Sequence, residues 1–156
     1  MRVVLDTNIF VSMLLGGRLG TLNDDWKAEK FVLVVSHAIV SEYEDVLVRP
    51  KLRLTADTIA PILDRVQRKA VFVTPDEELS VIADDPTDNK FLEAAVAATA
   101  DCVVSGEGHP LNLGSFRDIP IITTRGFLEL LSAWLLCLAA PCVDVSLAAG
   151  RVWVRG

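Results

Sequence analysis

Short apolar runs alternate along the 156-residue chain with longer stretches that have helical periodicity. Five runs are rich in β-branched residues and predict buried strands. They cover residues 3–5, 31–35, 71–73, 102–104 and 119–122. The helical stretches cover residues 9–15, 36–49, 56–69, 85–100 and a segment that opens at residue 124. Strands separated by helices predict βαβ units and an α/β fold, in which helices cover both faces of a parallel sheet.

Capping residues set the expected helix boundaries. Ser36 is a favourable N-cap for the helix after the second strand, and Pro50 is expected to end that helix. Thr55 is the expected N-cap of the next helix. In the Asp85-Pro86 pair, proline occupies the favoured first helical position, so Asp85 is the expected N-cap there.

Two segments fit the βα pattern less well. The glycines within residues 16–20 are expected to end the first helix, and the polar stretch 23–30 leads to the second strand. Residues 134–156 are apolar and match no βα unit, so a packed extension, a dimer surface and a poorly ordered tail all remain open for them. No linker or repeat divides the chain.

Composition indicates a globular protein, because 51% of the residues are hydrophobic and 23% are charged. The N-terminus has no signal-peptide pattern, and the apolar run at 134–143 is shorter than the roughly 20 residues that span a bilayer. The three cysteines have no metal-binding or disulfide spacing. We therefore expect a soluble, cytoplasmic protein that does not associate with membranes.

The net charge of −6 counts against a module that binds nucleic acid by electrostatics alone, because such modules are usually basic. It does not count against a metal-dependent nuclease, since a bound cation reverses the potential of a carboxylate cluster. Arg49, Lys51 and Arg53 are close in sequence and are candidate contacts to RNA phosphates. An ordinary solvated helix end explains them equally well.

Four acidic residues stand out by their positions. In an open parallel sheet, ligands bind at the carboxyl ends of strands, where the strand order reverses. Asp6 directly follows the first strand, and Glu107 follows the strand at 102–104. Glu42 lies at the edge of the apolar stripe of its helix, and Asp88 lies at the start of another helix.

Each of these acids also has a purely structural explanation. Asp6 is a good N-cap, and both Asp85 and Asp88 favour a helix start through the helix dipole. Glu42 is explained equally well as a surface residue that shields the core, and Glu107 as a solvated loop residue. The order of these residues along the chain is more informative than any one of them.

In that order they resemble the PIN-domain family, in particular its toxin components of toxin–antitoxin systems. The matching motifs are Leu5-Asp6-Thr7-Asn8, residues 41–47 followed by Arg49-Pro50-Lys51, residues 85–95, and Val104-Ser105-Gly106-Glu107. The resemblance covers roughly residues 1–132 and continues through residues 119–123 and 127–131. It leaves residues 133–156 as an apolar C-terminal extension.

The resemblance implies a three-layer α/β/α sandwich with a central parallel sheet of about five strands. It implies that Asp6, Glu42, Asp88 and Glu107 gather around Mg²⁺ or Mn²⁺. Asn8 and Ser105 correspond to polar positions that line the same pocket, and Asp85 supports it. The implied activity is hydrolysis of RNA phosphodiester bonds. The implied partners are a cognate antitoxin and, as a hypothesis, a second copy of the chain.

Simple chemistry agrees with this expectation. Clustered carboxylates repel one another, and a hard divalent cation relieves that repulsion. Such a cation activates water and stabilises the charge that develops on the phosphate. The sequence leaves open whether one or two cations act.

Three other functions share features with this sequence. An inactive PIN-like module that binds an antitoxin or another protein is the main alternative. It is favoured by the acidic net charge and by Glu107, which stands where the family usually has aspartate and is followed by Gly108 where a basic residue is common. A phosphatase of the haloacid-dehalogenase type needs DxD, and here Asn8 occupies the third position. A phospho-receiver domain needs an acidic pair and a late lysine, and neither is evident.

Overall fold

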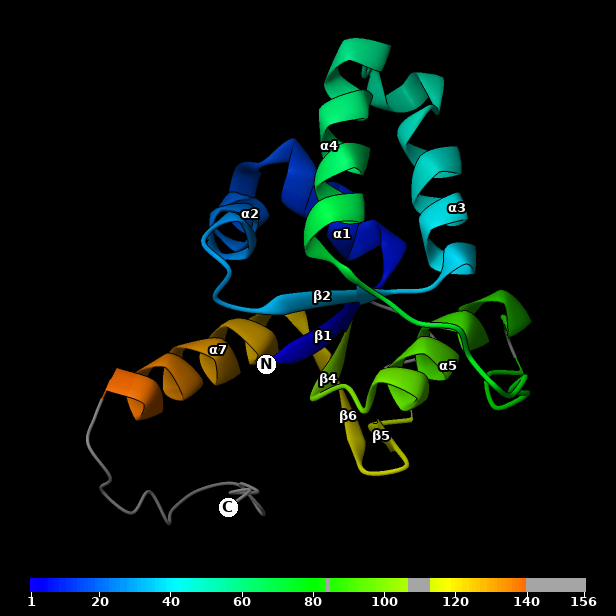
Figure 1. The fold of residues 1–156 in the computed structure, drawn as a ribbon, viewed down its shortest axis with the longest axis vertical. Helices are drawn as coiled ribbons and strands as arrows, with labels where there is room; N and C mark the ends of the chain where they lie inside the picture. The colour runs from blue at the N-terminus through cyan, green and yellow to red at the C-terminus, as the bar shows by residue number, and fades with distance from the viewer. Residues whose placement is uncertain (84, 107–112, 140–156) are drawn as a thin grey trace.

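The computed structural model describes residues 1–83, 85–106 and 113–139 (Figure 1). Its centre is a six-stranded sheet in the order β3-β2-β1-β4-β6-β5. The strands are β1 (Arg2–Leu5), β2 (Val32–Val35), β3 (Val71–Phe72), β4 (Cys102–Ser105), β5 (Ser115–Phe116) and β6 (Ile119–Thr123). All paired strands are parallel except β5, which runs antiparallel to β6.

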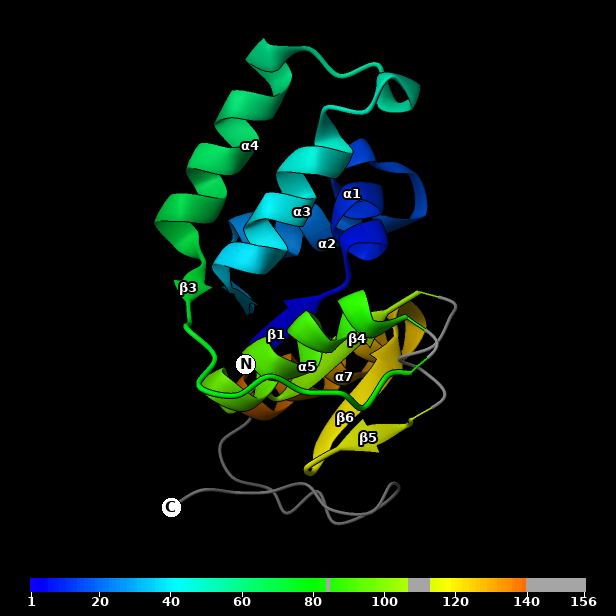
Figure 2. The same ribbon diagram turned by 90° about the vertical axis from the view of Figure 1, so that its right-hand side faces the viewer.

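Helices cover both faces of this sheet. They are α1 (Thr7–Leu15), α2 (Gly20–Lys27), α3 (His37–Leu47), α4 (Ala56–Lys69), α5 (Asn89–Ala98) and α7 (Thr124–Ala139). Short 3₁₀ turns lie at η1 (Gly17–Leu19), η2 (Pro50–Leu52) and η3 (Pro86–Asp88). In Figure 2, α5 lies in front of β1 and β4 and α7 lies behind them. The predicted α/β sandwich is therefore confirmed.

The central strands are buried on both faces, which explains why they read as continuous apolar runs. Every residue of β4 is buried, as are Val3, Val4 and Leu5 of β1. The pairing of Leu5 with Val104 aligns the carboxyl ends of these two strands. This register positions the candidate site described below.

Helix α2 was not predicted, because its sequence is mostly polar. Leu22 and Trp26 are four residues apart, lie on one face of the helix and are buried. Trp26 packs edge-on against Phe10 of α1, with ring centroids 6.2 Å apart. Two apolar positions are enough to hold a short helix on the core but too few to produce a clear periodic pattern.

Strand β5 was also not predicted. It pairs Phe116 with Ile119 around a two-residue turn at Arg117 and Asp118, whose φ angles are 47° and 66°. Two positive φ values are typical of the tight turns that join antiparallel strands. Asparagine and glycine usually mark such turns, and neither residue occurs in this one.

Several predicted boundaries differ from those observed. Helix α3 has the predicted N-cap Ser36 but ends at Leu47 rather than at residue 49. Thr55 occupies the N-cap position of α4, yet its side chain makes no capping hydrogen bond. The segment after Asp85 begins as a 3₁₀ turn and becomes α-helical only at Asn89. Helix α7 continues past residue 132 to Ala139, and residues 140–156 lie outside the described part.

Candidate active site

The sheet reverses its order beside β1. The chain runs outward from β1 to β2 and β3, then returns to place β4 on the other side of β1. In open α/β sheets the crevice beyond the carboxyl ends at such a point is where ligands bind. Asp6 follows β1 directly, and Ser105 is the last residue of β4. The predicted Asp6 and Ser105 therefore lie together at the reversal point.

Hydrogen bonds on both of its oxygens fix the Asp6 carboxylate. Asp6 is the N-cap of α1, and its Oδ1 accepts a 2.7 Å hydrogen bond from the backbone N–H of Asn8. Its Oδ2 accepts a 2.9 Å hydrogen bond from Oγ of the buried Ser105. The Asp6 N–H in turn donates to the Val104 carbonyl at 2.9 Å. Asp6 is thus both a helix cap and an oriented carboxylate, so the two explanations of this residue are compatible.

Glu42 lies on α3, next to a tyrosine that packs against β1 and α1. The adjacent residue Tyr43 is fully buried, stacks on Phe10 with centroids 3.9 Å apart, and donates a 2.6 Å hydrogen bond from its hydroxyl to the Leu5 carbonyl. Burial raises the pKa of Tyr43 well above its usual value, and the charges of Asp6 and Glu42 raise it further. Tyr43 therefore lies within electrostatic reach of both carboxylates.

The η3 turn brings Asp85 and Asp88 to the same region. Asp85 caps the turn, with Oδ1 accepting from the Thr87 N–H at 3.1 Å and from the Thr87 hydroxyl at 2.6 Å. Partial burial is the largest cause that raises the pKa of Asp88. Repulsion from Asp85, from Asp6 and, more weakly, from Glu42 raises this pKa further. The predicted acids Asp6, Glu42 and Asp85 therefore all lie within electrostatic reach of Asp88.

Lys90 supplies a positive charge at this site, and the sequence analysis missed it. Its Nζ forms an ion pair with Oε2 of Glu42 and donates a 2.7 Å hydrogen bond to the Thr87 carbonyl. The charge of Lys90 also lowers the pKa of Asp88, against the raising effects. The only available signal was a lysine two residues after Asp88, which on its own resembles any solvated lysine in a first helical turn.

Asn89 holds the acidic turn in place and was not singled out either. Its Oδ1 accepts hydrogen bonds from the Val81 and Ile82 N–H groups, both at 3.0 Å. Its Nδ2 donates to the carbonyls of Ile82 at 3.3 Å and Pro86 at 3.0 Å. The side chain is buried, so these four bonds attach the extended segment before the turn to the start of α5.

Other predicted residues are not gathered here. Arg49, Lys51 and Arg53 are exposed around η2, at the end of α3 and α4 that lies away from the sheet in both views (Figures 1 and 2). Asn8 is exposed in the first turn of α1, and only its backbone contact to Asp6 is defined. Glu107 lies outside the described residues.

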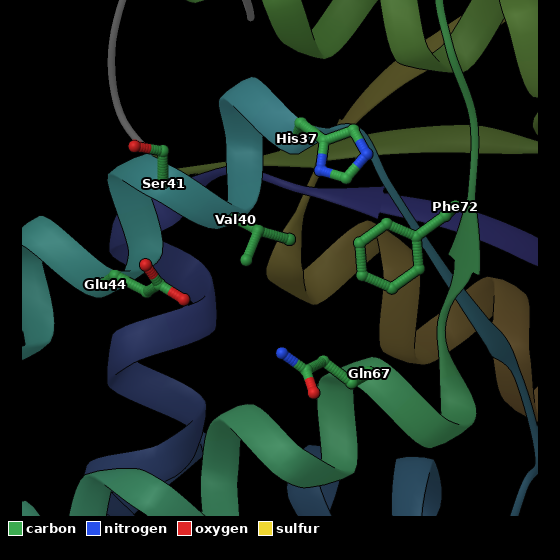
Figure 3. A pocket seen from close by; sticks show the side chains of 6 residues that line it. All are labelled: His37, Val40, Ser41, Glu44, Gln67 and Phe72. Atoms are coloured by element: carbon green, nitrogen blue, oxygen red, sulfur yellow. The ribbon is translucent and has the colours of Figure 1, made fainter.

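One hollow of the described surface lies elsewhere. It measures about 520 Å³ and is lined by His37, Val40, Ser41, Glu44, Gln67 and Phe72 (Figure 3). A neighbouring hollow of about 410 Å³ shares His37 and continues along residues 73–78. None of the predicted acids lines either hollow. Because hydrogen bonding and charge place the acids together, we locate the candidate site at the reversal point and not in these hollows.

The donor chemistry of the acidic site fits a hard divalent cation. Carboxylate oxygens are its preferred ligands, and the raised pKa of Asp88 reflects a repulsion that a cation would relieve. Among the described residues, however, no three Asp, Glu, His or Cys side chains are arranged as a ready set of ligands. In this conformation the ammonium of Lys90 provides the local positive charge.

Comparisons with known proteins agree with the fold. A family model described as PIN domain matches residues 2–109. The chain is 32% identical over 122 residues to the uncharacterized protein MJ1680 of Methanocaldococcus jannaschii, covering 75% of this chain and 76% of that protein. The crystal structure of PAE2754 from Pyrobaculum aerophilum matches with a TM-score of 0.55 at 18% identity, covering 85% of this chain and 90% of the other.

In the part of the chain that is described, no helix combines the length and apolar character needed to cross a membrane. The structural match to PAE2754 supports the fold, and the family model spans the segments that carry Asp6, Glu42 and Asp88. The chain belongs to the PIN-domain family, whose members are generally nucleases.

Proposed function

We propose that this chain is a Mg²⁺- or Mn²⁺-dependent endoribonuclease and the toxin of a toxin–antitoxin pair. The observation that carries the nuclease proposal is the convergence of Asp6, Glu42 and Asp88 where the sheet order reverses. The pKa values of two side chains support it, because the charges of Asp6 and Glu42 raise the pKa of both Asp88 and Tyr43. Family membership supports the reaction class.

In the proposed mechanism, Asp6, Glu42 and Asp88 would hold the cation, together with Glu107. When bound, it lowers the pKa of a water ligand and stabilises negative charge on the phosphate. Asp6 needs little reorganisation to take part, because Asn8 and Ser105 already fix its carboxylate. Water attacks phosphorus in line with the leaving ribose oxygen. One P–O bond forms as the other breaks, the attacking water loses a proton to solvent, and the leaving oxygen takes one up, so no covalent enzyme intermediate forms.

Cleavage of a 5′-labelled mixed RNA tests the nuclease proposal. We expect wild type to cut with Mg²⁺ or Mn²⁺ and to stop in EDTA. Asp6→Asn should cut more slowly by about a hundredfold or more, because a ligand of the cation is lost. Asp24→Asn is the matched control, since this exposed acid on α2 pairs only with Lys27 among the described contacts. Equal cutting by Asp6→Asn and Asp24→Asn would contradict the assignment.

The toxin role is tested in cells. Induced expression of wild type in a bacterial host should arrest growth, and induced Asp6→Asn at the same protein level should not. Co-expression of the adjacent open reading frame should restore growth to the wild-type strain. If wild type cuts RNA in vitro but cells that express it grow normally, the toxin role is contradicted and the nuclease proposal stands.

A second candidate function is an inactive PIN-like module that binds an antitoxin or another protein. The observation that favours it is the engagement of Glu42 by Lys90, which leaves the described acids without a ready set of cation ligands. Absence of cutting by folded wild type with either cation would favour this module over the nuclease.

A further inference from the structure

The Lys90 ammonium is held inside the acidic site instead of extending into water. Its side chain is only 14% exposed, whereas the carboxylate side chain of Glu42 is 31% exposed. Two contacts hold it, the ion pair with Glu42 and the hydrogen bond to the Thr87 carbonyl. Nζ also lies over the Phe91 ring, 5.1 Å from its centroid. Removing a lysine from water costs free energy, so these contacts must offset that cost.

Lys90 joins two segments that are far apart in sequence. Glu42 is on α3, while Lys90 and Thr87 belong to the η3–α5 segment that carries Asp88. The ion pair therefore connects the acid on α3 to the helix start on which Asp88 lies. A divalent cation between Glu42 and Asp88 would make the same connection through oxygen ligands.

The Lys90 ammonium and a divalent cation cannot both bind the Glu42 carboxylate at full strength. The ion pair occupies Oε2, and the ammonium adds a positive charge that repels a second cation at this distance. Resting on the proposed function, we infer that Lys90 is a positioning residue that substitutes for the divalent cation. It holds Glu42 in place when no divalent cation is bound, and it competes with that cation for Glu42.

Cation affinity and cation-free stability test this inference without any RNA. Metal-free wild type, Lys90→Met and Lys90→Arg are titrated with Mn²⁺ by calorimetry, and their melting temperatures are measured in EDTA. Lys69→Met is the matched control. Lys69 also pairs with a glutamate, Glu29 at 2.8 Å, and donates to a backbone carbonyl, that of Lys27 at 3.0 Å.

Lys90→Met should bind Mn²⁺ about tenfold more tightly than wild type, because a competing positive charge is gone. Its melting temperature in EDTA should fall, because Glu42 and Asp88 lose their counter-charge. Lys90→Arg should behave like wild type in both measurements. Lys69→Met should leave the Mn²⁺ dissociation constant unchanged. If Lys90→Met fails to fold by far-UV circular dichroism, Lys90→Gln replaces it, since glutamine keeps a polar end without the charge.

The outcomes separate this inference from the proposed function. If wild type binds Mn²⁺ and Lys90→Met binds it equally or more weakly, Lys90 does not compete with the cation. That result overturns the inference but leaves the nuclease proposal standing. Binding by Lys90→Met alone supports competition and contradicts a metal-dependent nuclease in the native chain. Absence of binding by every variant overturns both.

Discussion

The hydroxyl of Tyr43 donates a 2.6 Å hydrogen bond to the Leu5 carbonyl, one residue before Asp6. Because this contact is buried, Tyr43→Phe leaves a carbonyl without its partner, and we expect a loss of about 1–2 kcal/mol of unfolding free energy. Urea denaturation measures this loss. The Phe10 stacking partner is retained in the variant, so a loss near zero would mean that the hydrogen bond contributes nothing to stability.

Asp88 gives a stability prediction that depends on pH. Its folded-state pKa lies above the ordinary value of 3.8, so the folded chain binds more protons than the unfolded chain between those two values. The unfolding free energy therefore falls as the pH rises from 3.8 through the folded pKa. Asp88 also makes no side-chain capping bond to α5 that its replacement would remove.

At pH 7 in EDTA, Asp88→Asn should accordingly melt a few degrees above wild type. With Mg²⁺ or Mn²⁺ present, the same variant should lose RNA cleavage. Thermal unfolding at pH 3 and pH 7 measures the effect, and the gain should disappear at the lower pH. Asp57→Asn, in the first turn of α4, is the control and should not raise the melting temperature. A lower melting temperature for Asp88→Asn at pH 7 would show that repulsion does not dominate at this residue.

At the residue scale, the sequence indicates where strands end better than it indicates contacts between distant segments. Asp6 and Ser105 were predictable because strand ends are visible as the ends of apolar runs. Lys90 was not, because its partner Glu42 is 48 positions away in the chain, and only the packing of α3 beside α5 brings the two together.

Among the elements, η3 and α5 depend on one side chain. Asn89 makes four hydrogen bonds that attach residues 81–82 and Pro86 to the helix start. Asn89→Leu keeps the branching of the side chain but leaves the part-buried N–H of Val81 and the buried N–H of Ile82 unpaired, so we expect a loss of about 2–4 kcal/mol of unfolding free energy. Chemical denaturation measures it.

Activity should fall in the same Asn89→Leu variant, since the turn that carries Asp85 and Asp88 loses its attachment. Asn23→Leu on α2 is the control, because none of the described hydrogen bonds involves Asn23 Oδ1. Equal stability losses in the two variants would contradict a special role for Asn89.

The elements with strong local signals were predicted correctly. Helix α4 has an amphipathic pattern over fourteen residues, and β1 and β4 contain the apolar runs 3–5 and 102–104. By contrast, α2 and β5 are stabilised by contacts with α1 and β6, so their own sequences carry little of the information.

For the whole molecule, Cys102 in the central strand β4 is a probe of global opening. Burial, followed by the charge of Asp101, raises the pKa of its thiol to about 12. A buried neutral thiol reacts slowly, so labelling requires the sheet to open. In a Cys137→Ser, Cys142→Ser background, we expect the labelling rate at pH 8 to rise with urea in parallel with the unfolding equilibrium. Rapid labelling without urea would mean that β4 opens locally.

The hydrogen bond from Ser105 to Asp6 joins residues 99 positions apart, and its consequence concerns synthesis. A ribosome completes β1, α3 and the η3 turn before it makes β4, so a growing chain contains Asp6, Glu42 and Asp88 before it contains the strand that aligns Asp6. Until β4 leaves the exit tunnel and inserts beside β1, the hydrogen bond from Ser105 that orients Asp6 cannot form. Under the proposed function, we therefore expect cleavage to require β4, which the ribosome makes after the other elements of the site.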